Sequence, residues 1–272
     1  MSVRGVLAVA SVECSKLWAE AKARVVLAVC VAGPFAFVGA MLVQSAVPED
    51  TLFGRSVKES GCATPLVVLG FAGLWVFPVL TSIVSGDLFS AEDRYGTWTT
   101  VLTRSRSRAE VFTGKTLTAL GFSSLALAAL AASSVAAGVL VVGRQPLIDL
   151  SGALLPPGQA LCRVSLAWAS VLPPALGFTA LAMLLSVATR SSAAGIGLPV
   201  LAGLAMQFYA YVDGPEAIRR LLITSSFGAW HGLLTEHPYY QPLIQGTAVS
   251  GVYLVVCLAV AYRMLRRRDI GG

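Results

Sequence analysis

The chain of 272 residues contains 56% apolar and only 12% charged residues, and its mean hydropathy is +0.75. Soluble domains carry about 25% charged residues, so this composition excludes a water-soluble protein and indicates an integral membrane protein. The net charge of +6 reflects the enrichment of Lys and Arg in cytoplasmic loops and not a nucleic-acid partner.

The first 24 residues predict an amphipathic helix that lies on the inner membrane surface. Charged residues, among them Glu13 and Lys16, interrupt the segment regularly, which argues against a cleavable signal peptide. The apolar residues that fall roughly on one helical face are Val9, Val12, Leu17 and Ala21. A plain membrane anchor is the competing interpretation, and the sequence alone does not decide between the two.

Six segments are predicted to span the membrane, because a helix needs about 20 apolar residues to cross about 30 Å of hydrocarbon. The segments free of Asp, Glu, Lys and Arg that reach this length are 25–44, 64–86, 116–143, 164–189, 191–212 and 243–262. We therefore predict an all-α membrane protein whose 272 residues form a single transmembrane domain with six transmembrane helices.

Proline and small residues distinguish some of these spans. Four spans contain proline, which kinks a membrane helix where neighbours or water satisfy the freed carbonyl. These prolines are Pro34, Pro78, Pro173, Pro174 and Pro199. In the third span, a ladder of small side chains predicts a tight contact between helices. Its members are Ser124, Ala128, Ala132 and Ala136.

The orientation follows from the distribution of basic residues. If both termini are cytoplasmic, 14 of the 20 Lys and Arg residues lie in inner segments. The 6 in outer segments are Arg55, Lys58, Arg144, Arg163, Arg219 and Arg220. We expect a multi-pass protein of the cell membrane (plasma or inner membrane) with both termini cytoplasmic.

The loop between the second and third spans, residues 87–115, is the most informative stretch. Its segment Ser90–Thr116 is the longest strongly polar passage between two apolar spans. A connection between membrane helices needs only a few residues, so a loop this charged is predicted to contact a cytoplasmic partner. The alternative is a solvated flank of the membrane.

Residues 213–242 form an outer segment that is too apolar for a solvent loop. Its part Ile218–Leu234 is also too short to span, which favours a re-entrant or interfacial helical hairpin broken near Ser226–Gly228. Trp230, Tyr239 and Tyr240 are predicted at the outer interface.

Several chemical sites are excluded or left open. Gly114-Lys115-Thr116 lacks the preceding glycine of a phosphate-binding loop, because Ala109 occupies that position. His231 and His237 have no ligand partners at zinc spacing, so neither a metal nor a cofactor is expected on this chain. No catalytic grouping is found. Cys62 and Cys162 both fall near the predicted outer face, and whether they pair stays open.

The loop motifs resemble those of a known family. They are, in chain order, the acidic Glu92, Gly96-Thr97, the short helix Trp98–Thr103, the turn Arg104–Arg108 and Gly114-Lys115 at the start of a span. With the six spans, the N-terminal Glu13 and Lys16, and the apolar outer segment, the chain resembles a permease of the ABC-2 type ABC exporter family. The family often has a proline before the arginine of the turn, and this chain does not.

The resemblance implies a complex and a mechanism. Two copies of this permease, or this one with a relative, would pair in the membrane lipid, and each would dock on an ATP-binding subunit that carries ATP and Mg. The chain itself would not be an enzyme. Docking would use the Ser90–Thr103 coupling helix and the N-terminal helix. The implied docking residues are Glu92, Asp93, Arg94, Tyr95, Gly96, Thr97 and Trp98 with Glu13 and Lys16. Five of them are expected to be exposed for that contact: Glu92, Asp93, Arg94, Tyr95 and Trp98.

The resemblance also implies a transport pathway along the first, second and fifth spans. Candidate residues are Phe35, Phe71, Trp75, Met206, Gln207 and Tyr209, although each would equally suit lipid contact or core packing. A pathway without fixed charge favours export of a hydrophobic or amphipathic compound such as an antibiotic, drug or lipid. The alternatives are a stand-alone secondary transporter, which would want charged residues inside the spans, and a membrane scaffold or enzyme without an ATPase partner.

Overall fold

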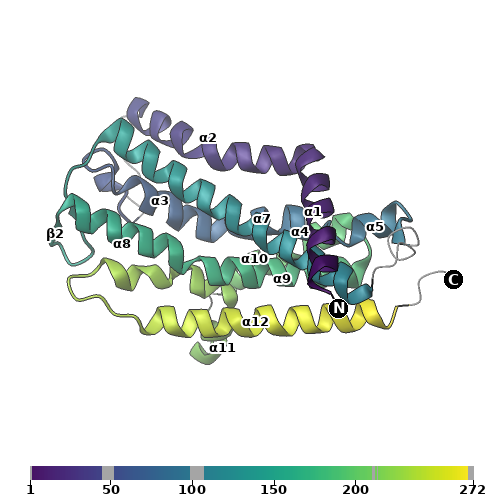
Figure 1. Cartoon of the computed structure of the whole chain (residues 1–272). Coiled ribbons are helices and arrows are strands. Elements are labelled where there is room, and N and C mark those ends of the chain that lie inside the picture. The colour runs from purple at the N-terminus through teal and green to yellow at the C-terminus, as the bar shows by residue number, and fades with distance from the viewer. Residues whose placement is uncertain (1, 45–51, 99–106, 210–211, 213, 269–272) are drawn as a thin grey trace.

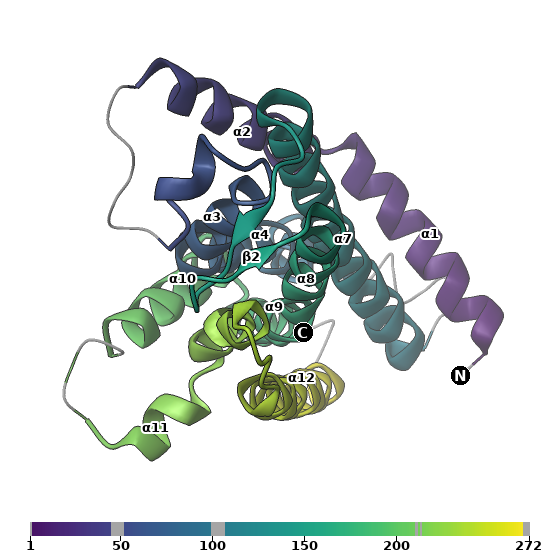
Figure 2. The same cartoon turned by 90° about the vertical axis from the view of Figure 1, so that its left-hand side faces the viewer.

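The structure is a computed structural model that describes residues 2–44, 52–98, 107–209, 212 and 214–268. Long helices run side by side as a bundle, and α1 (Val3–Ala19) crosses one end of it (Figures 1 and 2). The start of α1, the short helix α5 (Ser90–Arg94) and the end of α12 (Gln241–Arg266) gather at this end. The hairpin of strands β1 (Leu147–Ile148) and β2 (Leu154–Leu155) lies at the opposite end.

The N-terminal helix is present, but the face it buries differs from the predicted one. Ser2 caps α1 by accepting a hydrogen bond from the backbone N–H of Gly5. Glu20, in an extended conformation, forms the corner to α2 (Ala21–Val43). Val12 is exposed, whereas Glu13 is buried with Leu17 because α1 lies against α7 (Arg108–Ala137). The contact with α7 therefore decides the orientation of α1, and a pattern of apolar residues could not reveal it.

The second predicted span consists of three helical pieces in direct succession. These are α3 (Thr64–Phe71), the π-helical turn η2 (Ala72–Val76) and α4 (Phe77–Ser85). Pro78 stands in the first turn of α4 and has no N–H to donate, so the regular hydrogen-bond ladder cannot run through this position. A short 3-10 turn, η1 (Arg55–Val57), precedes α3.

In the described part of the chain, five helical segments are long and apolar enough to cross a membrane. They are Ala21–Val43, Arg108–Val142, Pro157–Thr189, Ser192–Tyr209 and Gln241–Arg266. The second combines α7 with the π-helical turn η3 (Gly138–Val142), and the third combines α8 (Pro157–Ser170) with α9 (Leu172–Thr189). Arg190, in the left-handed conformation, ends α9 before α10 (Ser192–Tyr209) begins. The helix from Arg108 starts eight residues earlier than its predicted span, and the helix from Pro157 starts seven residues earlier. The prediction began each span after its last charged residue, whereas the helices include these charged residues.

Residues 214–242 are largely helical, and the second helix is deeply packed, but the segment breaks elsewhere than predicted. It forms α11 (Glu216–Leu221) and the 3-10 helix η4 (Ile223–Leu234), with the break at the extended Leu222 and not near Ser226–Gly228. Trp230 is buried and not at an interface, whereas Tyr239 and Tyr240 are exposed. The β hairpin holds the end of η4 through a hydrogen bond from Leu150 N to Leu234 O of 2.8 Å.

Two further predictions concern contacts inside the bundle. The small-residue ladder of α7 does not make a tight contact within this chain, because Ala128 and Ala132 are exposed and the opposite face of α7 is buried. The question of a disulfide is answered as well, since both Cys62 and Cys162 are free thiols.

The interior contains two apolar clusters. The larger one lies between α3, α4, α8, α9 and η4, and its centre is aromatic: the rings of Phe77 and Phe227 are 5.3 Å apart, and Trp168 donates to Pro65 O at 3.2 Å. The smaller one, around Phe89 and Phe112, lies at the end where α1 and α5 meet α7. This smaller cluster forms the floor of the site described next.

Candidate coupling site

A buried lysine joins three helices at the crossed end of the bundle. Lys115 of α7 is 1% exposed, and its Nζ lies 2.8 Å from Oε2 of Glu13 in α1 and 3.0 Å from Oε1 of Glu92 in α5. It also donates to the backbone carbonyl of Leu88 at 3.0 Å. The adjacent Gly114 permits this approach, since a Cβ there would lie 2.6 Å from Cγ1 of Val9. Gly114 and Lys115 therefore hold α1 against α7, the first through close packing and the second through its ion pair with Glu13.

Lys16 completes the ion cluster. Its Nζ lies 2.9 Å from Glu13 Oε1 and 3.1 Å from Glu92 Oε1, and Thr97 donates a hydrogen bond to the other oxygen of Glu92. Two ammonium groups therefore face two carboxylates, which is the condition under which charges are tolerated inside a protein. We name Glu13, Lys16, Glu92 and Lys115 the ion cluster.

The ion cluster keeps Glu92 ionised. Burial raises the pKa of Glu92, but the charge of Lys115 and the hydrogen bond from Thr97 outweigh burial and lower the pKa from 4.5 to about 2. For Lys16, burial lowers the pKa, but the hydrogen bonds and charges of Glu13 and Glu92 together outweigh burial, so the pKa is raised. At neutral pH Glu92 and Lys16 are therefore both charged.

This arrangement predicts a dependence of stability on pH. A carboxyl group whose pKa is lowered by folding stabilises the protein above its unfolded pKa, and the contribution is lost as the pH falls through its folded pKa. For Glu92 this window runs from 4.5 to about 2. We expect Glu92→Gln to lower the melting temperature in detergent at pH 7 and to flatten its decline between pH 5 and pH 3. Glu236→Gln, at an exposed position between η4 and α12, is the control, and equal profiles for the wild type and both variants would contradict the assignment.

A second set of contacts attaches the end of α12 to α5. Asp93 Oδ1 accepts a hydrogen bond from Trp98 Nε1 at 3.0 Å and pairs with Arg268 Nη2 at 2.6 Å. The guanidinium of Arg268 also lies 5.8 Å from the centre of the Trp98 ring. Arg108, at the start of α7, donates to the carbonyls of Leu265, Arg266 and Arg268. Leu265 and Arg266 are the last residues of α12, and Arg268 follows two residues later. The carbonyls in the last turn of a helix lack intrahelical donors, so Arg108 helps to cap the end of α12.

The expected docking residues therefore fall into two groups. Glu92, Asp93 and Trp98 were expected on the surface, but Glu92 and Trp98 are buried and Asp93 is partly buried. Their distant partners are Lys115 of α7 and Arg268, which follows α12. Arg94 and Tyr95 are exposed, and Tyr95 carries the guanidinium of Arg94 4.7 Å above its ring. The exposed Gly96 has a positive φ of 62° and lies in the turn between α5 and Trp98. Of the coupling helix expected at 98–103, Trp98 is helical and the remainder lies outside the described residues.

The candidate pathway residues lie on the predicted elements. Phe35 of α2, Phe71 of α3 and Trp75 of η2 are exposed. Met206, Gln207 and Tyr209 of α10 are partly buried. None of the six lines the cavity around the ion cluster or the cavity at the corner between α1 and α2.

Sequence reasoning missed the role of two residues. Asp87 is buried beside Lys22 and Arg94, and nothing in its neighbourhood along the chain marks it. Arg268 is the third of three consecutive arginines, and only its ion pair with Asp93 distinguishes it from the other two. A signal did exist for Lys115, which is the only Lys or Arg of α7 beyond its first residue.

Comparison with known proteins places these contacts in a family. A model of the ABC-2 family transporter protein matches residues 11–205, from α1 to α10. The chain belongs to the ABC-2 transporter family. Among curated proteins no match is found. The matched region includes the whole ion cluster, whereas α11, η4 and α12 lie beyond it. Membership makes the chain the transmembrane component of a transporter and implies association with an ABC ATP-binding subunit.

Proposed function

We propose that this protein is the permease subunit of an ATP-driven exporter, in which two permeases pair and each docks on an ATP-binding subunit. The observation that carries the proposal is the ion cluster, which joins α5, the segment expected to meet the ATPase, to α1 and α7. The family match supports the general class, and the cargo and stoichiometry are our inference.

The proposed membrane topology has six spans, with α3, η2 and α4 forming the second. Their uninterrupted run of 22 residues from Thr64 to Ser85 supports this, since about 20 residues cross the hydrocarbon core. Both ends of the chain would be cytoplasmic. The gathering of α1, α5 and the end of α12 at one end of the bundle supports that orientation (Figure 1), together with the basic Arg263, Arg266 and Arg267 there.

In the proposed mechanism, the ATPase pushes on α5 and the permease moves with it. The contacts of Lys115 would transmit the displacement to α1 and α7, and the pair of Asp93 with Arg268 would transmit it to α12. A buried ion pair resists separation, because parting the charges leaves each of them without a partner in a poorly solvated place. The helices around α5 would therefore move as one body, which is what tilting of a permease by ATP binding requires.

Direct contact with the ATPase is assigned to Tyr95, the exposed residue that directly follows α5. Exposed aromatic side chains often anchor protein interfaces. We expect Tyr95→Ala to reduce recovery of the ATPase subunit on purification of the tagged permease with its neighbouring genes, and to leave the melting temperature of the permease unchanged. Tyr239→Ala, at an exposed position of the opposite end, is the matched control. Equal ATPase recovery with both variants would remove Tyr95 from the interface.

The cargo is proposed to be hydrophobic or amphipathic, moving past Phe35, Phe71, Trp75 and α10. The support is that these aromatic side chains are exposed on a face without fixed charge. We expect Trp75→Ala to change efflux of hydrophobic dyes from cells by several-fold, with unchanged ATPase recovery. Leu125→Ala, on the exposed face of α7, should leave efflux unchanged. Loss of ATPase recovery in Trp75→Ala would instead make Trp75 a structural residue.

A further inference from the structure

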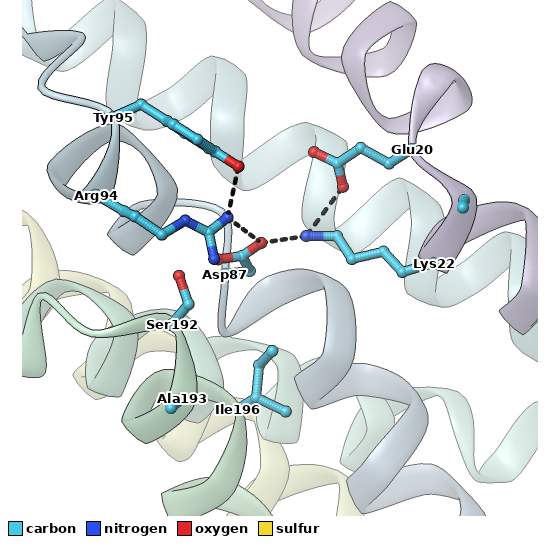
Figure 3. A pocket seen from close by; sticks show the side chains of 9 residues that line it. Glu20, Lys22, Asp87, Arg94, Tyr95, Ser192, Ala193 and Ile196 are labelled. Atoms are coloured by element: carbon cyan, nitrogen blue, oxygen red, sulfur yellow. Dashed lines mark hydrogen bonds and ion pairs between the residues drawn. The ribbon is translucent and has the colours of Figure 1, made fainter.

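A cavity of about 460 Å³ lies at the corner between α1 and α2, beside α5 and the first turn of α10 (Figure 3). Small-molecule sites typically measure about 300–1,000 Å³. One side of the cavity is polar and the other is apolar. The polar lining residues are Glu20, Lys22, Asp87, Arg94, Tyr95 and Ser192, and the apolar ones are Ala21, Ala193 and Ile196.

The charges of this cavity are balanced. Lys22 Nζ contacts Asp87 Oδ2 and lies 2.9 Å from Glu20 Oε2, and Arg94 Nη2 lies 3.7 Å from Asp87 Oδ2. Lys22 and Arg94 keep 30% and 49% of their side chains exposed, so both cations remain accessible. A purely anionic ligand would meet the two carboxylates, and a purely cationic ligand would meet the two cations. A ligand carrying both charges fits the cavity.

Asp87 is the buried acid of this cavity. Its side chain is 7% exposed, and its Oδ2 atom faces the two cations Lys22 and Arg94. Burial raises the pKa of Asp87, but the hydrogen bonds from Lys22 and Ser192 and the charges of Lys22 and Arg94 lower it, so the group is ionised. A primary ammonium group carries three donors, and one of them can share Oδ2 with Lys22.

The apolar side of the cavity continues into the membrane. Ala21 lines the cavity, and Val25 and Val29 follow it at four-residue spacing along α2, each about 60% exposed. Because α2 and α10 are candidate membrane helices that begin at the cavity, this strip would run among lipid acyl chains. The cavity therefore lies where the headgroup of a lipid meets its tails.

We propose that this cavity binds a phospholipid whose headgroup carries a primary ammonium. Lys22 and Arg94 would bind the phosphate, Asp87 would accept hydrogen bonds from the ammonium, and the acyl chains would lie along Val25 and Val29. This ligand would hold the corner between α1 and α2 against α5 and α10. The inference does not depend on an ATPase partner or on the direction of transport.

The test compares three lipids on the purified full-length protein in detergent, by native mass spectrometry and thermal unfolding. We expect phosphatidylethanolamine to be retained and to raise the melting temperature more than phosphatidylcholine, whose trimethylammonium has no hydrogen-bond donor, or phosphatidylglycerol, which has no cation. Arg94→Met should weaken binding of phosphatidylethanolamine about tenfold, since a charge-assisted hydrogen bond is lost. Arg24→Met, at an exposed position of α2, should bind like the wild type.

Three results would overturn the proposal. Equal retention of the three lipids would show an unspecific lipid surface, and preference for phosphatidylglycerol would show a merely basic one. If Arg94→Met retains phosphatidylethanolamine like the wild type but loses the ATPase subunit on co-purification, the cavity is a protein docking site instead. Because lipid binding is measured on the permease alone, its failure is distinguishable from a failure to recover the ATPase.

Discussion

Replacing Lys115 with Met is expected to produce one of the largest losses of stability available in this chain. The substitution removes the ammonium that lies 2.8 Å from Glu13 and 3.0 Å from Glu92, and leaves two carboxylates with less than a tenth of their side chains exposed. Removing one partner of a buried ion pair costs about 3–5 kcal/mol, a large part of the total stability of about 5–15 kcal/mol of a typical protein. The melting temperature and the monodisperse peak in gel filtration measure the loss.

A matched set of variants separates charge from packing at this site. Lys16→Met removes the other ammonium, but Lys16 is 47% exposed and water replaces much of the pair, so its effect should be small. The triple variant Lys115→Met, Glu13→Gln and Glu92→Gln contains no unpaired buried charge, and it should recover much of the melting temperature. A melting temperature of Lys115→Met within error of the wild type would contradict the description of the ion cluster.

The triple variant also tests the coupling role under the proposed function. It retains Tyr95, so it should still recover the ATPase subunit. It lacks the ionic contacts between α5, α1 and α7, so ATP hydrolysis should continue while efflux falls. Efflux at the wild-type rate in a stable triple variant would show that the cluster only stabilises the fold.

The extent of the helices was largely predictable from the sequence, because membrane spans are read from length and the absence of charge. The choice of the buried face was not. In a soluble helix, alternation between apolar and polar residues marks the buried face, but in a membrane both lipid and the protein interior accept Ala and Leu. Ala128 and Ala132 therefore look like a contact face, whereas Ser123 and Ala126 are buried.

The sequence pointed to the loop that contains the candidate site, but it did not reveal which side chains of that loop are buried. Glu92 and Trp98 belong to a charged loop, and a loop residue is exposed unless a distant partner covers it. The partners are Lys115 and Arg268, which lie 23 and 170 residues away in the sequence. Nothing local distinguishes an ion-paired glutamate from a solvated one. The same limit applies to Asp87, which pairs with Lys22 across 65 residues.

A second large effect is expected where α4 meets α10. A Cβ built on Gly195 would lie 2.2 Å from the carbonyl oxygen of Gly86, and a Cβ on Gly86 would lie 2.2 Å from the oxygen of Gly195. Because the obstacle is backbone on both sides, the two helices must move apart. A Cβ on Gly195 would also lie 3.2 Å from Cα of Ser186 in α9. Ser186 in turn holds the start of α5, since its Oγ accepts hydrogen bonds from the N–H groups of Phe89 and Ser90 at 3.3 and 3.1 Å.

Gly195→Ala should therefore lower the melting temperature and reduce ATPase recovery, with a cost at or above the about 1–3 kcal/mol typical of overpacking. Gly197→Ala is a close control, because Gly197 lies two residues after Gly195 on the same helix. No atom stands within 4 Å of a Cβ built on Gly197. Alanine also favours a helix over glycine by about 0.5–1 kcal/mol. The two substitutions should thus act in opposite directions. The double variant Gly86→Ala, Gly195→Ala should cost less than the sum of the single changes, because helices already separated by one methyl group accommodate the second. Additive losses would mean that each glycine acts through its own helix and not through their contact.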